Sequence, residues 1–77
     1  MNQAQALHAK SLARHIREHA EVIVRRMRYL ESEDLTNVPV NVVNNFTVEA
    51  EFECKEIKTV IADMQTQLEN MPDFPKR

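Results

Sequence analysis

Two heptad patterns of apolar residues constrain this chain more than any other feature of its sequence. The first pattern advances by alternating steps of three and four and is formed by Ala6, Ala9, Ala13, Ile16, Ala20, Ile23, Met27 and Leu30. Such spacing places one apolar stripe along an α-helix. Neither glycine nor proline interrupts the sequence around this stripe. We therefore expect a first helix over about residues 2–34.

The second pattern follows the same rule and consists of Ala50, Cys54, Ile57, Ile61, Met64, Leu68 and Met71. Thr47 is a suitable N-cap for it, and Pro72 ends it because proline cannot continue a helix. We expect a second helix over about residues 47–71. Together the patterns predict an all-α fold, an antiparallel two-helix hairpin that forms a single domain over residues 1–71 with a short tail at 72–77.

The connection between the helices, residues 35–46, is apolar and is expected to be extended. Pro39 biases Val38 toward extended geometry, and Val38, Val40 and Val42 recur with the period of two that is typical of a strand. Three interpretations follow. The segment is a loop folded over the end of the helices, an extended segment that pairs with a second copy or docks on a partner, or one turn of helix capped by Asn37.

The length of the chain favours self-association. A chain of 77 residues buries too little apolar surface to be very stable alone, and Cys54, the single cysteine, excludes an internal disulfide. A two-helix hairpin also leaves half of its apolar stripe in water. We therefore expect a homodimer that forms a four-helix bundle, with Cys54 buried in the seam. A monomer whose connection covers the seam is the alternative.

The first helix also carries two further faces. One is a basic stripe within a sector of about 80°, formed by Lys10, Arg14, Arg17, Arg25 and Arg28. The other is semi-apolar and contains His8, His15, His19, Val22, Arg26 and Tyr29. The basic stripe lies to one side of the apolar seam of the first helix. The acidic residues of the second helix lie to the other side of the seam of that helix, and they are Glu49, Glu53, Glu56 and Asp63. We therefore expect that these acids and the basic stripe do not meet within one hairpin.

One local motif suggests metal chemistry. His15 and His19 flank Glu18 in an H-x-x-E-H arrangement, and two histidines four residues apart on a helix can share one metal ion. A third ligand and a substrate cleft are missing from so short a chain. We therefore expect no metal site, with His15 and His19 as weak candidates, no cofactor and no enzymatic activity.

These features predict a small non-enzymatic protein-binding module, an adaptor, inhibitor or assembly and regulatory factor that acts as a helical homodimer. The residues expected to bind an unidentified protein partner are Lys10, Arg14, Arg17, Arg25, Arg28, Val38, Val40 and Val42. The alternative is a nucleic-acid-binding regulator that uses the basic stripe. The single free cysteine, the lack of a signal peptide and the absence of a long apolar run predict a cytoplasmic protein without a membrane partner.

Overall fold

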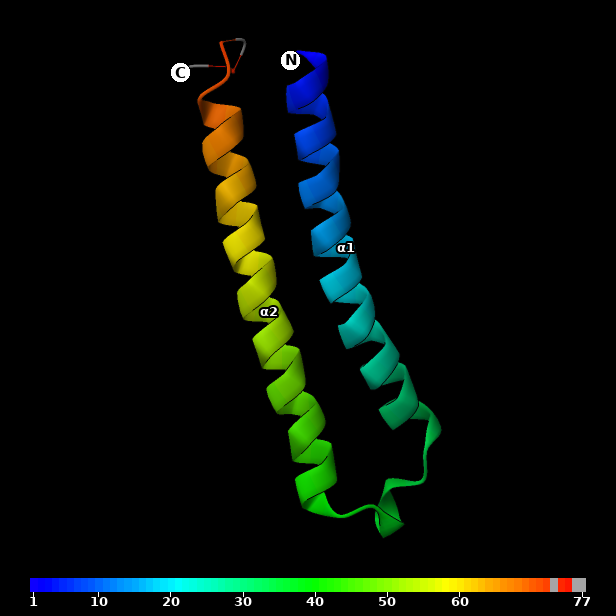
Figure 1. Cartoon of the computed structure of the whole chain (residues 1–77). Helices are drawn as coiled ribbons and strands as arrows, with labels where there is room; N and C mark the ends of the chain where they lie inside the picture. The colour runs from blue at the N-terminus through cyan, green and yellow to red at the C-terminus, as the bar shows by residue number, and fades with distance from the viewer. Residues whose placement is uncertain (73, 76–77) are drawn as a thin grey trace.

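The computed structural model describes residues 1–72, 74 and 75, and it is a hairpin of two long helices (Figure 1). Helix α1 spans Gln3–Ser32, a short 3-10 helix spans Leu35–Asn37, and helix α2 spans Val40–Glu69. The helices run in opposite directions, so that the start of α1 and the end of α2 lie at one end of a rod of 56 × 21 × 18 Å. The predicted all-α hairpin is confirmed.

Side-chain caps fix both ends of α1. Asn2 Oδ1 accepts a hydrogen bond from the Gln5 N–H at 2.8 Å, and Gln5 Oε1 accepts one from the Asn2 N–H at 2.9 Å. This reciprocal capping box satisfies two backbone donors that a helix start otherwise leaves unpaired. At the other end, Ser32 Oγ donates to the Tyr29 carbonyl at 2.9 Å. The acidic side chains that follow Ser32 oppose the helix dipole and favour an end there.

The connection is shorter than expected because α2 begins at Val40. Asp34 Oδ1 accepts hydrogen bonds from the Thr36 N–H at 3.1 Å and the Thr36 hydroxyl at 2.7 Å, which caps the 3-10 helix. Pro39 then precedes α2 with φ −58° and ψ 141°. Its ring fixes φ at a value that suits a helix start, where its missing N–H is not needed.

The expected extended connection over residues 35–46 is therefore wrong for residues 40–46, which are helical. Without glycine, nothing in this segment ends a helix once Pro39 has started it, and the strand preference of three valines is too weak to prevent it. Thr47 is not the N-cap of the second helix. It lies inside α2, and its hydroxyl donates to the Asn44 carbonyl at 2.7 Å.

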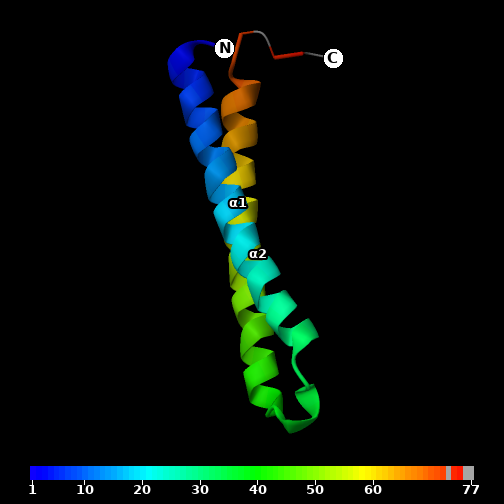
Figure 2. The ribbon, with the colours of Figure 1, turned by 90° about the vertical axis from the view of Figure 1, so that its right-hand side faces the viewer.

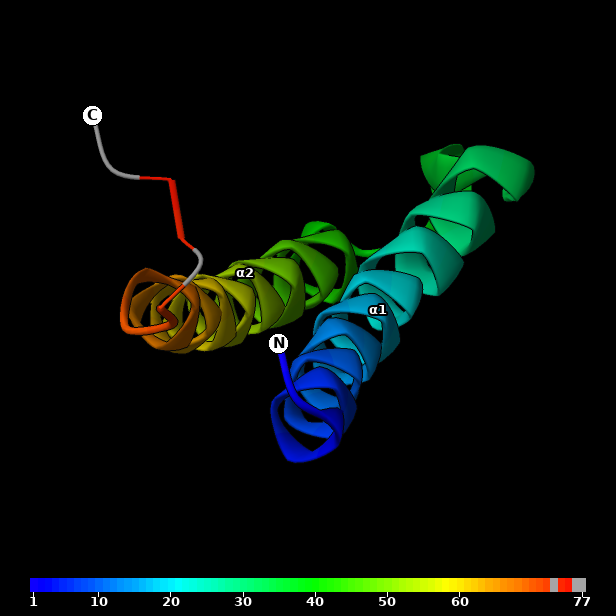
Figure 3. The same ribbon diagram turned by 90° about the horizontal axis from the view of Figure 1, so that it is seen from above.

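The contact between α1 and α2 uses most of the predicted seam but is shifted toward one side of it. In α1 every predicted seam residue except Ala13 is half-buried, and in α2 only Cys54 and Ile61 of the predicted seam are exposed. Leu12, which lies outside the heptad pattern, is only 7% exposed, whereas Ala13 in the pattern is exposed. In α2, Val60 lies outside the pattern and is half-buried, while Cys54 and Ile61 in the pattern are exposed. The two helices cross at a shallow angle (Figures 2 and 3). Only part of each apolar stripe is therefore used inside the single chain.

Apolar side chains close the end of the rod at which α1 starts and α2 ends. Helix α2 ends before Pro72, and Met71 is only 7% exposed. The Phe74 N–H donates to the Met71 carbonyl at 3.1 Å. Phe74 and Met71 line a small hollow together with Leu68 and Met1. Of the tail predicted at 72–77, residues 73, 76 and 77 lie outside the described residues.

Candidate interaction surfaces

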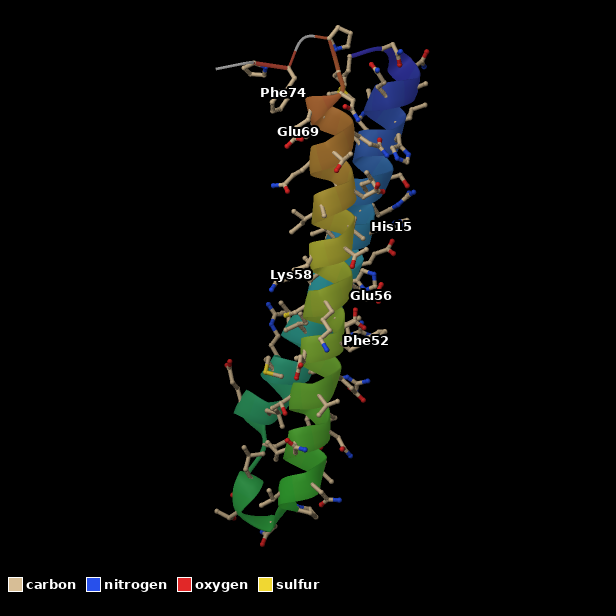
Figure 4. The ribbon with its side chains drawn as sticks, turned by 90° about the vertical axis from the view of Figure 1, so that its left-hand side faces the viewer. His15, Phe52, Glu56, Lys58, Glu69 and Phe74 are labelled. Carbon is tan, nitrogen blue, oxygen red and sulfur yellow. The ribbon has the colours of Figure 1, made fainter. Side chains whose placement is uncertain are left out.

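The hairpin has two long faces of different chemistry. Turning about 100° per residue from Leu12 puts Ala13, Ala20 and Val24 on one flank of α1 and His8, Arg26 and Tyr29 on the other. The same construction from Ile57 puts Cys54, Ile61 and Leu68 on one flank of α2 and Glu49, Glu53 and Gln67 on the other. Figure 4 views the rod from the α2 side, with His15 and Glu56 on one edge and Lys58 on the opposite edge.

The polar face is formed by His8, His19, Arg26 and Tyr29 of α1 and by Glu49, Glu53 and Gln67 of α2. Three contacts join the two helices across it. Arg26 Nε lies 3.0 Å from Glu49 Oε2, His19 Nδ1 is hydrogen-bonded to Glu53 Oε2, and His8 Nε2 to Gln67 Nε2. Because these side chains touch, both polar flanks must lie on the same face of the hairpin. The two apolar flanks consequently share the opposite face.

An aromatic pair supports the polar face near the connection. The rings of Tyr29 and Phe46 meet edge to face with centroids 5.6 Å apart, a favourable geometry for aromatic quadrupoles. The guanidinium carbon of Arg26 lies 5.2 Å from the centroid of Phe46, within the range of a cation–π contact. The semi-apolar face that the sequence indicated on α1 therefore borders the contact with α2, and several of its side chains reach α2.

The apolar face is formed by Ala13, Ala20 and Val24 of α1 and by Cys54, Ile61 and Leu68 of α2. Val24 is 46% exposed and Ile61 is 38% exposed, and the side chains of Ala13 and Cys54 are exposed as well. No side-chain hydrogen bond or ion pair involves any of the six. Alanines at this position leave a shallow surface on which another helix can pack closely.

The solvent-accessible surface area of the chain is larger than that of a compact monomer of the same mass. A compact monomer of 9.0 kDa exposes about 4,900 Å² by the usual scaling with mass, whereas this chain exposes 6203 Å². The excess, roughly 1,300 Å², is larger than the approximately 800 Å² that each partner buries in a standard protein interface. The rod therefore has enough uncovered surface for a stable interface.

The basic stripe lies on the outer side of α1 and is exposed along its length, and Arg25 lies at its border with the polar face. Lys10, Arg14, Arg17, Arg25 and Arg28 are all exposed. Within the described part of the chain, their single ion pair joins Arg17 to Glu21 at 2.8 Å, inside α1. The expectation that the acids of α2 do not meet this stripe is confirmed. Glu49 and Glu53 instead meet Arg26 and His19.

A cleft opens on the polar face near the connection. It has a volume of about 530 Å³ and is lined by Val22, Arg25, Arg26, Tyr29 and Phe46. Its lining combines apolar and cationic side chains. The sequence indicated the α1 side of this cleft, because Val22, Arg26 and Tyr29 belong to the predicted semi-apolar face. It did not indicate Phe46, which lies 17 positions after Tyr29.

The remaining candidate residues do not gather into a site. Val40 is 84% exposed at the start of α2, while Val38 and Val42 are half-buried. His15 is exposed, and His19 is hydrogen-bonded to Glu53. Among residues 1–72, 74 and 75, no three histidine, cysteine or acidic side chains are placed to hold a metal ion. Neither described helix has an apolar stretch long enough to cross a membrane.

Comparisons with known proteins add no functional information. No protein-family model matches the chain, and neither the curated proteins nor the solved structures contain a match. The two faces and the cleft are therefore the basis for a functional proposal.

Proposed function

We propose that this chain is a non-enzymatic protein-binding module that works as a helical homodimer. The observation that carries the proposal is the contrast between its two faces. One face is joined by polar contacts between α1 and α2. The other exposes Val24 and Ile61, and its six residues make no side-chain hydrogen bond or ion pair with the part of the chain that the structure describes. An apolar face of this length on a soluble helical protein is a surface for association.

A second copy of the hairpin suits the apolar face because of how four-helix bundles are packed. In such a bundle each helix touches two neighbours, and its apolar seam points between them. Helix α1 contacts α2 through the Leu12 side of its seam, which leaves the Ala13 side for a second neighbour. A twofold-related hairpin supplies that neighbour with the same surface. The dimer buries the excess area and keeps the polar faces outside.

The charges favour a protein partner over a nucleic acid. Glu21 lies within the basic stripe and already pairs with Arg17. The aromatic residues Tyr29 and Phe46 meet one cation of the stripe, Arg25, in a shared cleft, and Glu49 pairs with Arg26 beside them. A single-stranded nucleic acid is bound by several cations interleaved with aromatic rings, whereas among the described residues only Arg26, which is outside the stripe, lies over an aromatic ring. We therefore propose an adaptor, inhibitor or assembly factor.

The proposal is tested by placing a charge on the apolar face. Ile61→Glu should convert a dimer of twice 9.0 kDa into a monomer, because two carboxylates would be buried next to each other across the twofold axis. We expect the dissociation constant of the dimer to rise about 100-fold or more, which corresponds to a loss of at least about 2.7 kcal/mol of association free energy. Light scattering coupled to size-exclusion chromatography measures the mass directly.

Phe52→Glu is the matched control for this experiment. It makes the same kind of substitution on the same helix at a side chain that is 58% exposed and lies on the other edge of the rod (Figure 4). The proposal requires the Phe52 variant to remain a dimer. A monomeric parent chain, or equal weakening by both variants, would show that the apolar face is not the interface.

A further inference from the structure

The cleft on the polar face combines two properties that a plain helix contact does not need. Val22, Tyr29 and Phe46 give it an apolar lining, and the side chains of Arg25 and Arg26 line it as well. Tyr29 is 48% exposed, so that much of its ring is open to an incoming side chain. A volume of about 530 Å³ lies within the usual range of ligand clefts.

The two arginines differ in their charge balance. Arg26 is neutralised by Glu49 at 3.0 Å and lies over Phe46. Arg25 is exposed and has no hydrogen-bond or ion-pair partner among the described residues. The cleft therefore has an excess of one positive charge, and that charge is free to meet a carboxylate in a charge-assisted hydrogen bond.

We propose that this cleft binds a short acidic segment of a partner protein. An aromatic or large aliphatic side chain of the segment fills the space over Val22, Tyr29 and Phe46, and a neighbouring carboxylate pairs with Arg25. This inference rests on the proposed protein-binding function and names the partner class. Because the cleft lies on the polar face, opposite the apolar face, a dimer has two such sites and both stay accessible.

The charges around the cleft argue against a nucleic acid as its occupant. Glu49 lies beside the cleft in its pair with Arg26, and the acids Glu31, Glu33 and Asp34 follow at the end of α1. A nucleic acid needs several cations in a row to neutralise successive phosphates. One free guanidinium beside these acids suits a peptide that brings one carboxylate close to an apolar side chain.

The test uses a synthetic peptide with a central phenylalanine flanked by two glutamates on each side, titrated into the full chain. Binding is followed by two-dimensional NMR, and shift changes are expected at the backbone amides of Val22–Tyr29 and Phe46. Replacing all glutamates of the peptide by glutamine, or its phenylalanine by serine, should each weaken binding about tenfold, because each removes one of the two matched contacts.

Variants of the protein locate the contact. Arg25→Glu should lower the affinity for the acidic peptide about tenfold or more. Tyr29→Ala should lower it as well, without the same sensitivity to salt. Lys55→Glu is the matched control, because it makes the same change of charge on the outer surface of α2, where Lys55 is exposed and pairs only with Glu51 at 3.6 Å. The control variant should bind the peptide like the parent chain.

Several results would overturn the inference. They are equal loss of binding in the Arg25 and Lys55 variants, equal binding of the glutamine peptide, or tighter binding of a single-stranded oligonucleotide of matched charge. The mass of each sample is measured in parallel. A monomer that binds the acidic peptide contradicts the proposed dimer and leaves the cleft intact, whereas a dimer that does not bind it contradicts the cleft alone.

Discussion

The polar and apolar faces of the hairpin are formed by the same two helices but differ in the contacts that their side chains make. On the polar face, Arg26, His19 and His8 each contact a polar side chain of α2. On the apolar face, Ala13 and Ile61 have no polar neighbour and remain exposed. We expect the polar contacts to select which flanks of α1 and α2 come together, because they join one flank of α1 to one flank of α2. The apolar face supplies surface that the single chain does not bury.

The difference also separates specificity from stability. Exposed ion pairs such as Arg26–Glu49 contribute about 0–1 kcal/mol each, whereas buried apolar side chains contribute about 1.5–3 kcal/mol each. Leu12 and Met71 are the only buried apolar residues among those described, and each is still 7% exposed. The hairpin by itself therefore has a defined shape but little core. Covering the apolar face is the larger source of stabilisation available to it.

The largest predicted effect comes from the contact between the helices. Leu12→Ala should lower the free energy of unfolding by about 2–4 kcal/mol, because it removes the most buried side chain of α1 and leaves a cavity against α2. Chemical denaturation followed by circular dichroism measures this change. Leu7→Ala is the control, since Leu7 is 59% exposed on the outer side of the same helix. It should change the free energy by less than about 0.5 kcal/mol.

Equal effects at the two leucines would mean that the helices do not pack in the register described. The comparison is sharp because both substitutions shorten the same side chain on one helix. Both also improve intrinsic helix propensity slightly. Any difference between them therefore reports burial.

The architecture and most residues of the helix contact could be predicted from the sequence, but the flank toward which the contact is shifted could not. Alternating steps of three and four identify an apolar stripe and, with Pro72, the approximate ends of the helices. They do not reveal which flank of that stripe a given neighbour takes. Leu12 lies one residue before Ala13, and only its contact with α2 shows that it is the buried one of the two. The polar pairs between the two flanks join Arg26 to Glu49 and His19 to Glu53. The partners are far apart in the sequence, so that no local sequence pattern indicates these pairs.

The start of α2 and the α2 side of the cleft were missed for related reasons. The valines at 38, 40 and 42 have strand-like spacing, yet the segment after Pro39 is helical. Helix formation there is supported by Phe46, whose ring packs against Tyr29. That contact also forms the cleft. Long-range packing therefore overrode a local β-propensity, and the same contact created the site.

A second prediction concerns the apolar face directly. Ala13→Leu adds a large apolar side chain where a second hairpin is proposed to pack closely. It should weaken the dimer by about 1–3 kcal/mol through overpacking, measured by sedimentation equilibrium or by the concentration dependence of the melting temperature. In an isolated hairpin the same side chain would lie in solvent and change stability by less than about 0.5 kcal/mol. An unchanged dissociation constant of the dimer would show that Ala13 does not lie in the interface.

The smallest effects should come from the polar face, where burial ranks the Glu53–His19 and Glu49–Arg26 contacts. The Glu53 side chain, paired with His19, is 17% exposed, whereas that of Glu49, paired with Arg26, is 46% exposed. Glu53→Gln should therefore cost about 1 kcal/mol of unfolding free energy, because a partly buried charged contact is poorly screened by water. Glu49→Gln should cost about 0.5 kcal/mol or less. Denaturation at low and at 1 M salt distinguishes them, since screening should erase the Glu49 effect and preserve most of the Glu53 effect. If both effects vanish in salt, neither pair selects the helix flanks, and apolar packing at Leu12 alone must set the register of the hairpin.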